Sequence, residues 1–304
     1  MNLIPILSGT GVALVTPFNS RMEIDEPALI RLIDFVIEGG VEYVVTLGTT
    51  GETPVLSKEE KIRIADLTIN AVNGRVPVVI GSGGSDTRAV VKEIEALPTD
   101  GAVAILSASP YYSKPSQEGI YQHYKAIADA SPKPLLLYNV PARTARNVDA
   151  QTILRLTQHP NIAGIKEAGG DMAQCALVLR DRPEDFLVVS GDDALAFPQI
   201  ATGMHGVISV AANSFPDAFS SMVRAALAGN LGKAKELNDS LLEAYYLLFV
   251  ENNPAGVKAA LTALGVIENN LRLPLVPLSN AYNEQLKSYI KRAGHPAFSS
   301  LQKA

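Results

Sequence analysis

The sequence predicts an α/β protein whose core is a closed (β/α)₈ barrel, with a helical appendage at the C-terminal end. Eight runs rich in Val, Ile and Leu recur along the chain, and segments with apolar residues at helical spacing lie between them. No hairpin signal joins consecutive runs, so each strand reaches a parallel neighbour through a helix. Eight such units in about 220 residues are the number that closes a TIM barrel.

The predicted strands are apolar almost throughout, which is typical of parallel strands covered on both faces. They span residues 11–18, 41–48, 76–83, 101–109, 134–140, 162–168, 186–192 and 206–211. Helical patterns such as EPALIRLIDFVIEGG separate them, and only helical patterns remain after residue 228. We therefore predict a catalytic barrel over residues 1–228 and a helical domain over residues 229–304.

An open, doubly wound sheet is the competing architecture, which a glycine-rich dinucleotide loop would favour. The stretch GSGGSD, residues 81–86, is superficially similar to such a loop. However, Asp86 stands where the motif requires its third glycine, and the stretch follows the third predicted strand rather than the first. We interpret it as a strand-to-helix turn in which Asp86 caps the helix.

Charge and composition exclude several classes of partner. The 304-residue chain has a formal charge of -5 and no run rich in Lys or Arg, so we expect no nucleic-acid or membrane partner. Cys175 is the single cysteine, which excludes an internal disulfide and indicates a packed thiol. The histidines (His123, His159, His205 and His295) lack metal-ligand spacing, so we expect no metal. No charged leader or long apolar run is seen, which predicts a cytoplasmic protein.

The stretch IAGIKEAGG, residues 162–170, places a lysine inside a buried strand. Lys166 is either held in an ion pair or kept dry so that its amine can react. Glu167 is adjacent, but successive side chains of a strand point to opposite faces, so it is not the natural partner. Burial disfavours a charged ammonium, and a neutral amine condenses with ketones. Lys166 is therefore a candidate nucleophile, with a structural ion pair as the competing interpretation.

Other reactive side chains follow the predicted strands at their carboxyl ends, which meet at one mouth of a barrel. They are Thr49, Thr50 and Glu52 after the second strand, Tyr111 and Tyr112 after the fourth, Tyr138 and Arg143 at and after the fifth, and Asp192 and Asp193 after the seventh. The threonines fit both a helix cap and a carboxylate site. The adjacent tyrosines alone would indicate packing. We interpret the two aspartates as caps of the next helix, without a chemical role.

Six motifs resemble, in order and spacing, those of the class I aldolase superfamily typified by dihydrodipicolinate synthase and N-acetylneuraminate lyase. They are GTTGET (48–53), SPYYSKPSQEG (109–119), LYNVPART (137–144), GIKEAGG (164–170), SGDD (190–193) and GVISV (206–210). The resemblance continues to the segments NPAGVKAAL and LRLPLVPLS near the C-terminus, so it covers nearly the whole chain.

The resemblance implies a role for each matching residue. Lys166 would form a covalent Schiff base with C2 of pyruvate, and no separate cofactor is implied. Tyr138 would transfer protons and would be linked through Thr50 to Tyr112, which in this family usually comes from the neighbouring subunit. The substrate-binding residues that the resemblance implies are Thr49 and Thr50 for the pyruvate carboxylate, Gly191 and Ile208 through their backbone carbonyls, and Arg143.

Arg143, in the stretch PART, discriminates between branches of the superfamily. It matches the arginine of the synthases that condense pyruvate with aspartate semialdehyde, whose carboxylate a guanidinium can grip in bidentate fashion. Sialic-acid lyases usually lack it, and Arg146 lies close enough in sequence to share the role. The resemblance thus implies the formation of 4-hydroxy-tetrahydrodipicolinate from pyruvate and L-aspartate 4-semialdehyde, toward diaminopimelate and lysine.

The resemblance also implies an assembly and a regulatory property. A homodimer, or a homotetramer built as a dimer of dimers, would complete the site. Lysine-inhibited members carry an Asn, a Glu and a His where we place Ser85, Ala89 and Lys58, so we expect weak or absent feedback by lysine, although Tyr111 is retained.

Three rival interpretations of the function stay open. The first is another pyruvate-dependent aldolase or dehydratase that acts on a keto-sugar acid, in the manner of N-acetylneuraminate lyase. The second is a non-catalytic binding barrel, which the retained site residues disfavour. The third is a barrel that uses pyridoxal phosphate, for which no phosphate cup is visible in the sequence.

Overall fold

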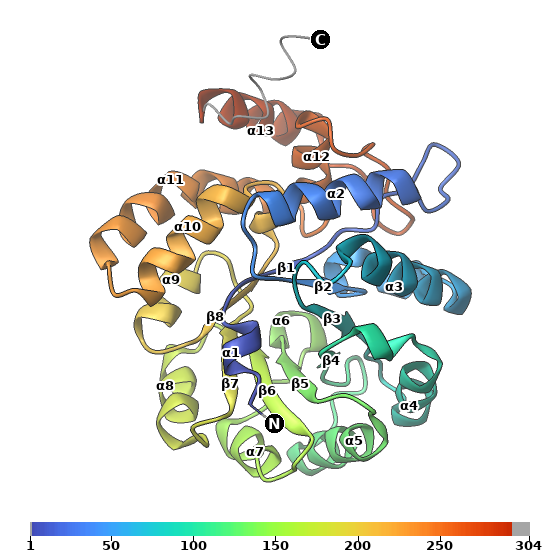
Figure 1. The fold of residues 1–304 in the computed structure, drawn as a ribbon, viewed down its shortest axis with the longest axis vertical. Coiled ribbons are helices and arrows are strands. Elements are labelled where there is room, and N and C mark those ends of the chain that lie inside the picture. Colours follow the sequence, from blue (N-terminus) through green and yellow to red (C-terminus); the bar gives the residue numbers. More distant parts are fainter. Residues whose placement is uncertain (1, 294–304) are drawn as a thin grey trace.

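Eight parallel strands close into a barrel in the computed structural model, which describes residues 2–293 (Figure 1). The strands are β1 (Gly9–Ala13), β2 (Tyr43–Thr46), β3 (Val78–Gly81), β4 (Ala104–Ala108), β5 (Leu135–Asn139), β6 (Ile162–Glu167), β7 (Leu187–Ser190) and β8 (Gly206–Ser209). Each pairs with the next, and β8 pairs with β1, so the barrel has no free edge. The predicted fold class is confirmed.

The apolar runs of the sequence extend past the ends of the strands. β1 ends at Ala13, although the run predicted a strand as far as residue 18. Leu14 still donates its N–H to the carbonyl of Val45 at 3.0 Å, but Pro17 has no N–H to continue the ladder. Phe18 is nevertheless fully buried. Apolar composition therefore reports burial beneath the loops of the barrel mouth as well as strand pairing.

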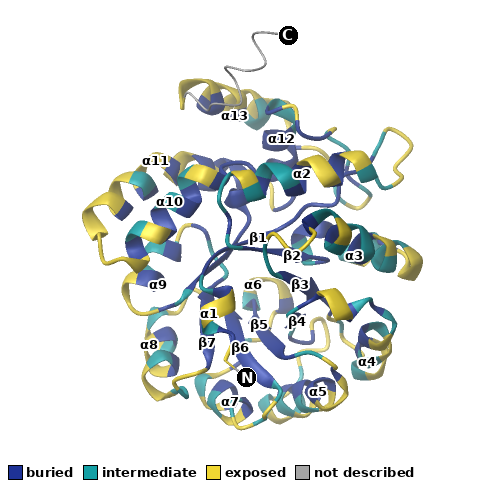
Figure 2. Ribbon diagram, in the orientation of Figure 1, coloured by how far each residue is buried: buried dark blue, intermediate teal, exposed yellow. Residues whose placement is uncertain are grey.

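Helices separate the strands and turn one face inward (Figure 2). They are α1 (Ile4–Leu7), α2 (Glu26–Glu38), α3 (Lys58–Val72), α4 (Thr87–Ala96), α5 (Gln117–Ala130), α6 (Pro141–Thr144), α7 (Ala150–Leu156), α8 (Met172–Asp181), α9 (Ala196–Ala201) and α10 (Pro216–Leu227). The carboxylate of Asp86 accepts from the N–H of Arg88 at 2.9 Å at the start of α4. The predicted strand-to-helix turn and its cap are confirmed.

The core consists of two clusters on either side of the strands. The outer cluster lies between the strands and the helices, whereas the inner cluster fills the barrel with residues such as Leu136, Val189 and Ile208. Leu3 and Leu7, at and beside α1, belong to the inner cluster. Because α1 directly precedes β1, these two leucines close the amino-terminal end of the barrel.

Within residues 2–293, three further helices follow the barrel, namely α11 (Leu231–Phe249), α12 (Ala255–Ala263) and α13 (Asn280–Arg292). α11 packs on α10, and α12 and α13 pack on each other and on α11, as Figure 1 shows in orange to red. The boundary predicted at residue 228 falls between α10 and α11, and residues 294–304 lie outside the described residues. No helix within residues 2–293 is long and apolar enough to span a membrane.

Candidate active site

β5 and β6 place Tyr138 and Lys166 side by side on the inner face of the barrel. The parallel register pairs the two residues, and Tyr138 belongs to the inner cluster, so both side chains point inward. Both are buried, with 8% exposure for Tyr138 and 5% for Lys166. The Nζ atom of Lys166 lies 4.3 Å from the centroid of the Tyr138 ring, a cation–π contact. The structure thus brings the predicted nucleophile and the predicted proton-transfer residue together.

Glu167 lies on the outer face of β6 and is bound by other groups. Its carboxylate accepts from the side-chain amide of Asn139 at 3.0 Å and from that of Gln174 at 3.3 Å. Burial raises the pKa of Glu167, and these hydrogen bonds oppose the shift. The lysines that form ion pairs within residues 2–293 do not include Lys166. An ion pair with Glu167 is therefore excluded.

Gly191 follows β7 and packs directly against Lys166. A Cβ atom at Gly191 would lie 2.9 Å from Cε of Lys166 and 2.7 Å from Cβ of Ala168. Only glycine lets the backbone approach the lysine this closely. Ile208 lies in β8 within the inner cluster. The carboxyl ends of β5 to β8 thus surround the lysine with a tyrosine ring, a backbone segment and an apolar wall.

The predicted carboxylate-binding threonines lie in a single 3₁₀ turn, η1 (Thr49–Gly51), directly after β2. Thr50 is buried, and its hydroxyl accepts from the side-chain amide of Asn253 at 2.9 Å. Thr16 donates its hydroxyl to the carbonyl of Gly51 at 2.7 Å and secures the end of the turn. Within the described residues, the hydroxyl of Thr50 forms its hydrogen bond with Asn253 rather than with Tyr138.

Asn253 was not predicted as a site residue. It precedes α12, in the segment NPAGVKAAL, and is only 5% exposed. The segment belongs to the resemblance noted above, but an amide followed by proline in a helical tail carries no distinctive chemical signal. Its contact with Thr50 crosses 203 residues of sequence, which no local pattern reveals.

Tyr112 lies apart from the other predicted catalytic residues. Its side chain is 93% exposed, and its φ of 68° lies in the left-handed region. Tyr111 beside it is 43% exposed. The relay of Tyr138, Thr50 and Tyr112 is therefore not assembled within one chain, as expected if a second subunit supplies Tyr112.

Arg143 is held at the rim of the barrel by the segment that precedes α12. It lies in α6 and is exposed, and its Nη2 donates to Oδ1 of Asn252 at 3.0 Å and to the carbonyl of Asn253 at 3.4 Å. Arg146 differs, because its Nε donates to the carbonyl of Pro115 at 2.8 Å. The same short segment therefore contacts both Arg143 and Thr50.

The two aspartates after β7 have different structural roles. Oδ1 of Asp192 accepts from the N–H of Ala194 at 2.9 Å in the turn that leads into α9. Asp193 is buried and accepts from the N–H groups of Val210 and Ala211, at 3.2 and 2.8 Å. Burial raises the pKa of Asp193 to about 6. The prediction that Asp193 caps the next helix is wrong, because it instead ties the end of β7 to that of β8.

The remaining polar groups supply no further site. Cys175 is a free, buried thiol, as predicted, and burial raises its pKa to about 11. Among the described residues, no group of three or more His, Cys, Asp or Glu side chains could hold a metal ion.

A closed barrel with a buried amine at the carboxyl ends of its strands defines the class of protein, a (β/α)₈ barrel with its site at the mouth. Within that class, the chain belongs to the dihydrodipicolinate synthetase family, whose sequence profile matches residues 6–293. It is 48% identical over 287 residues to a 4-hydroxy-tetrahydrodipicolinate synthase of Parabacteroides distasonis, a match that covers 94% of this chain and 97% of the relative.

Solved structures agree with this assignment. The chloride-inhibited dihydrodipicolinate synthase of Acinetobacter baumannii in complex with pyruvate has a TM-score of 0.92 and 41% identity, over 95% of this chain and 99% of that chain. A dihydrodipicolinate synthase variant characterised as monomeric has a TM-score of 0.93 and 38% identity, over 96% of this chain and 99% of that chain.

Proposed function

We propose that the chain is a class I aldolase-type lyase that condenses pyruvate with L-aspartate 4-semialdehyde to 4-hydroxy-tetrahydrodipicolinate. The observation that carries the proposal is Lys166, which is buried beside Tyr138 without a carboxylate partner among residues 2–293. The named relatives support the choice of substrates, because the 4-hydroxy-tetrahydrodipicolinate synthase of Parabacteroides distasonis matches nearly its full length.

The chemistry begins with attack of Nζ of Lys166 on C2 of pyruvate. Loss of water gives an iminium ion, which withdraws electrons so that C3 can release a proton and form an enamine. The enamine carbon attacks the aldehyde carbon of the second substrate, and the aldehyde oxygen takes up a proton. The amino group of that substrate then displaces Lys166 and closes the ring. Tyr138 lies beside the amine, where a phenol can exchange protons with the reacting atoms.

Two sets of groups bind the substrate carboxylates in this proposal. Thr49 and Thr50 offer backbone N–H groups and hydroxyls close to the mouth, a suitable site for the carboxylate of pyruvate, whereas the N–H of Gly51 binds the carbonyl of Gly48. Arg143 lies at the rim and binds the carboxylate of aspartate semialdehyde. Gly191 and Ile208 line the pocket between them.

We further propose that two subunits complete each site, in a homodimer or a dimer of dimers. The exposed side chain of Tyr112 supports this proposal, because a phenol that is 93% exposed is free to enter the mouth of a neighbouring barrel. One solved relative is a variant characterised as monomeric, so sedimentation of this chain is the direct test of its assembly.

Borohydride trapping with pyruvate tests the proposed chemistry. Wild-type protein should give a reduced pyruvate adduct on the peptide that carries Lys166, and Lys166→Ala should give none. No adduct on folded wild-type protein would refute the Schiff-base mechanism and favour a binding barrel.

A substrate panel tests the second half of the proposal. Pyruvate with aspartate semialdehyde should give product, whereas keto-sugar acids should not be cleaved. Cleavage of a keto-sugar acid, with no product from aspartate semialdehyde, would assign the chain to the other branch of the superfamily.

A further inference from the structure

The residue after the carboxylate-binding turn is anchored by the C-terminal helices. Glu52 directly follows the turn Thr49–Gly51 and is buried, with a φ of 56° in the left-handed region. Its carboxylate forms an ion pair with Lys258 of α12, and both side chains are 0% exposed. The other carboxylate oxygen accepts from the backbone N–H of Arg272 at 3.0 Å.

Lys258 is the one charged residue of α12. Its ammonium also donates to the carbonyl of Asn270 at 2.8 Å and lies 4.3 Å from the centroid of the Phe18 ring. Burial lowers the pKa of Lys258 to about 8, and the carboxylate of Glu52 opposes the shift. Desolvation makes a buried ion pair a poor source of stability, so apolar side chains would serve stability as well. Stability alone therefore does not explain why these two buried positions are charged.

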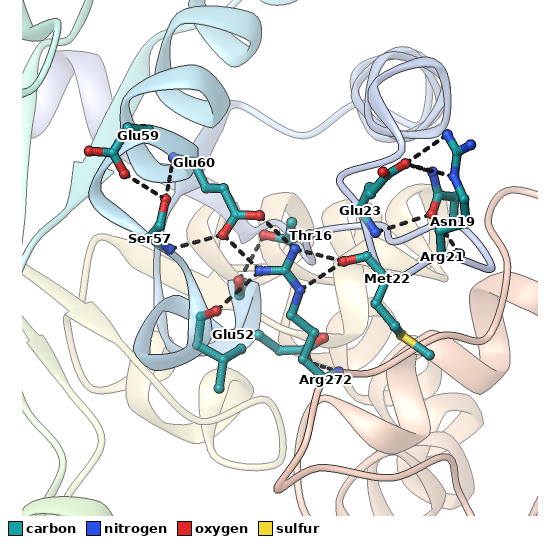
Figure 3. A network of polar contacts seen from close by, with 12 residues as sticks. Thr16, Asn19, Arg21, Met22, Glu23, Glu52, Ser57, Glu59, Glu60 and Arg272 are labelled. Atoms are coloured by element: carbon teal, nitrogen blue, oxygen red, sulfur yellow. Dashed lines mark hydrogen bonds and ion pairs between the residues drawn. The ribbon is translucent and has the colours of Figure 1, made fainter.

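Arg272, whose backbone N–H binds Glu52, is itself held by two neighbouring segments. The guanidinium of Arg272 binds both oxygens of Glu60, on α3, at 2.6 and 2.7 Å and donates to the carbonyl of Met22 at 2.7 Å. Figure 3 shows Arg272 between Glu60 and Met22, beside Glu52. The residue that binds Glu52 is thus fixed by hydrogen bonds to α3 and to the segment before α2.

The segment from Asn253 to Lys258 contacts the turn Thr49–Gly51 and the residue after it. Asn253 binds the hydroxyl of Thr50, and Lys258 binds the carboxylate of Glu52, two residues further along the chain. Thr16 and Asn253 hold the turn itself, and the ion pair with Lys258 holds the residue that follows it. The ion pair restrains Glu52 in its left-handed conformation and, through the chain, the orientation of the N–H groups of Thr49 and Thr50.

We propose that Lys258 is a positioning residue, which through its ion pair with Glu52 holds the turn Thr49–Gly51 in the geometry that binds the carboxylate of the first substrate. The inference rests on the proposed function, in which that substrate is pyruvate. Lys258 touches no reacting atom in this scheme and acts only through Glu52.

Two variants separate positioning from stability. Lys258→Met removes the ammonium but leaves Glu52 unpaired, whereas the double variant Glu52→Gln with Lys258→Met leaves no buried charge. We expect both to raise the pyruvate concentration for half-maximal borohydride trapping roughly 10-fold or more, since small displacements of positioning groups cost up to ~10²-fold. The double variant should regain thermal stability without regaining pyruvate affinity.

Glu93→Gln is the matched control. It removes the carboxylate partner of Lys61, in a partly buried ion pair between α3 and α4, and leaves the ion pair between Glu52 and Lys258 intact. We expect lower thermal stability and an unchanged half-saturating pyruvate concentration. An increase as large as that in Lys258→Met would show general loosening and would overturn the positioning role.

The other outcomes also decide between the proposals. If Lys258→Met does not fold, the double variant alone gives the comparison. A folded double variant that is half-saturated at the same pyruvate concentration as wild type would overturn the positioning role. The proposed function would still stand, because wild-type protein would still form the adduct. Wild-type protein that gives no adduct overturns both proposals.

Discussion

Lys166 and Lys258 are both buried, yet their amines have different surroundings. Lys258 meets a carboxylate and a backbone carbonyl, whereas Lys166 faces the ring of Tyr138 and forms no ion pair with the described residues. A carboxylate stabilises the protonated ammonium, which is not nucleophilic. Burial alone therefore does not separate the lysine that we propose as the nucleophile from a structural one. Lys166 differs from Lys258 in having no carboxylate partner among the described residues.

Methionine at each of the two positions should give opposite results. Lys166→Met should lower kcat roughly 10³-fold or more, because the nucleophile is lost. Its free energy of unfolding should change by no more than ~1 kcal/mol, since an apolar side chain fits a buried position that lacks an ion pair. Lys258→Met should lower the free energy of unfolding by roughly 3–5 kcal/mol, because Glu52 is left buried and unpaired. Urea denaturation and steady-state kinetics measure both, and equal destabilisation of the two variants would make Lys166 structural.

A second comparison, between two arginines at the rim, sharpens the assignment of the second substrate. Arg143→Ala should lower kcat/KM for aspartate semialdehyde roughly 10- to 100-fold, since a charge-assisted hydrogen bond contributes about 1.5–3 kcal/mol. Arg146→Ala should stay within ~2-fold of wild type, because its Nε binds the carbonyl of Pro115. Equal losses in the two variants would mean that the arginines share the role.

Two buried titratable groups away from the lysines should affect stability in opposite directions. His123 binds the hydroxyl of Thr87 at 2.8 Å, its Nε2 is buried without a partner among the described residues, and burial lowers its pKa to about 4. Between pH 6.5 and 4 the unfolded chain binds a proton at His123 that the folded chain does not. The free energy of unfolding therefore decreases as the pH is lowered through this range. Asp193, with its pKa raised to about 6, has the opposite effect, because the folded chain protonates first.

His123→Gln should remove the first of these two effects. The difference in free energy of unfolding between wild type and variant should shift by about 2–3 kcal/mol in favour of the variant from pH 7 to pH 4.5. Urea denaturation at the two pH values measures the shift. A constant difference would show that His123 has the same pKa in the folded and the unfolded chain.

The smallest expected effect is that of free lysine. Ser85, Ala89 and Lys58 leave an ammonium-bearing effector without the carboxylate that inhibited relatives supply, and Ser85 instead donates to the carbonyl of Tyr111 at 2.7 Å. We therefore expect submillimolar lysine to leave the rate unchanged. Inhibition in that range would place the effector site on other residues.

The fold could be predicted because buried parallel strands require apolar runs, and eight such runs are visible in the sequence. The inward direction of Lys166 could also be predicted, since side chains alternate along a strand and Glu167 had to face outward. The ends of the strands could be predicted less well, because buried loop residues such as Phe18 continue the apolar run beyond β1.

The ion pair between Glu52 and Lys258 beside the proposed site could not be predicted from the sequence. Glu52 and Lys258 are 206 residues apart, and periodicity carries no information about which buried charges will meet. A usable signal was nevertheless present, because Lys258 is the one charged residue in the predicted helical segment NPAGVKAALTALG. A charge at such a position needs a partner, although the sequence does not say which one.

The leucines that close the amino-terminal end of the barrel limit where reactants can enter and leave. Leu3 and Leu7 leave the carboxyl end as the entrance for both substrates and the exit for water and product. Lys166 lies below the rim at 5% exposure, whereas Arg143 is exposed at the rim. In the proposed function we therefore expect pyruvate to bind before aspartate semialdehyde, because a substrate held at the rim would block the open end of the barrel.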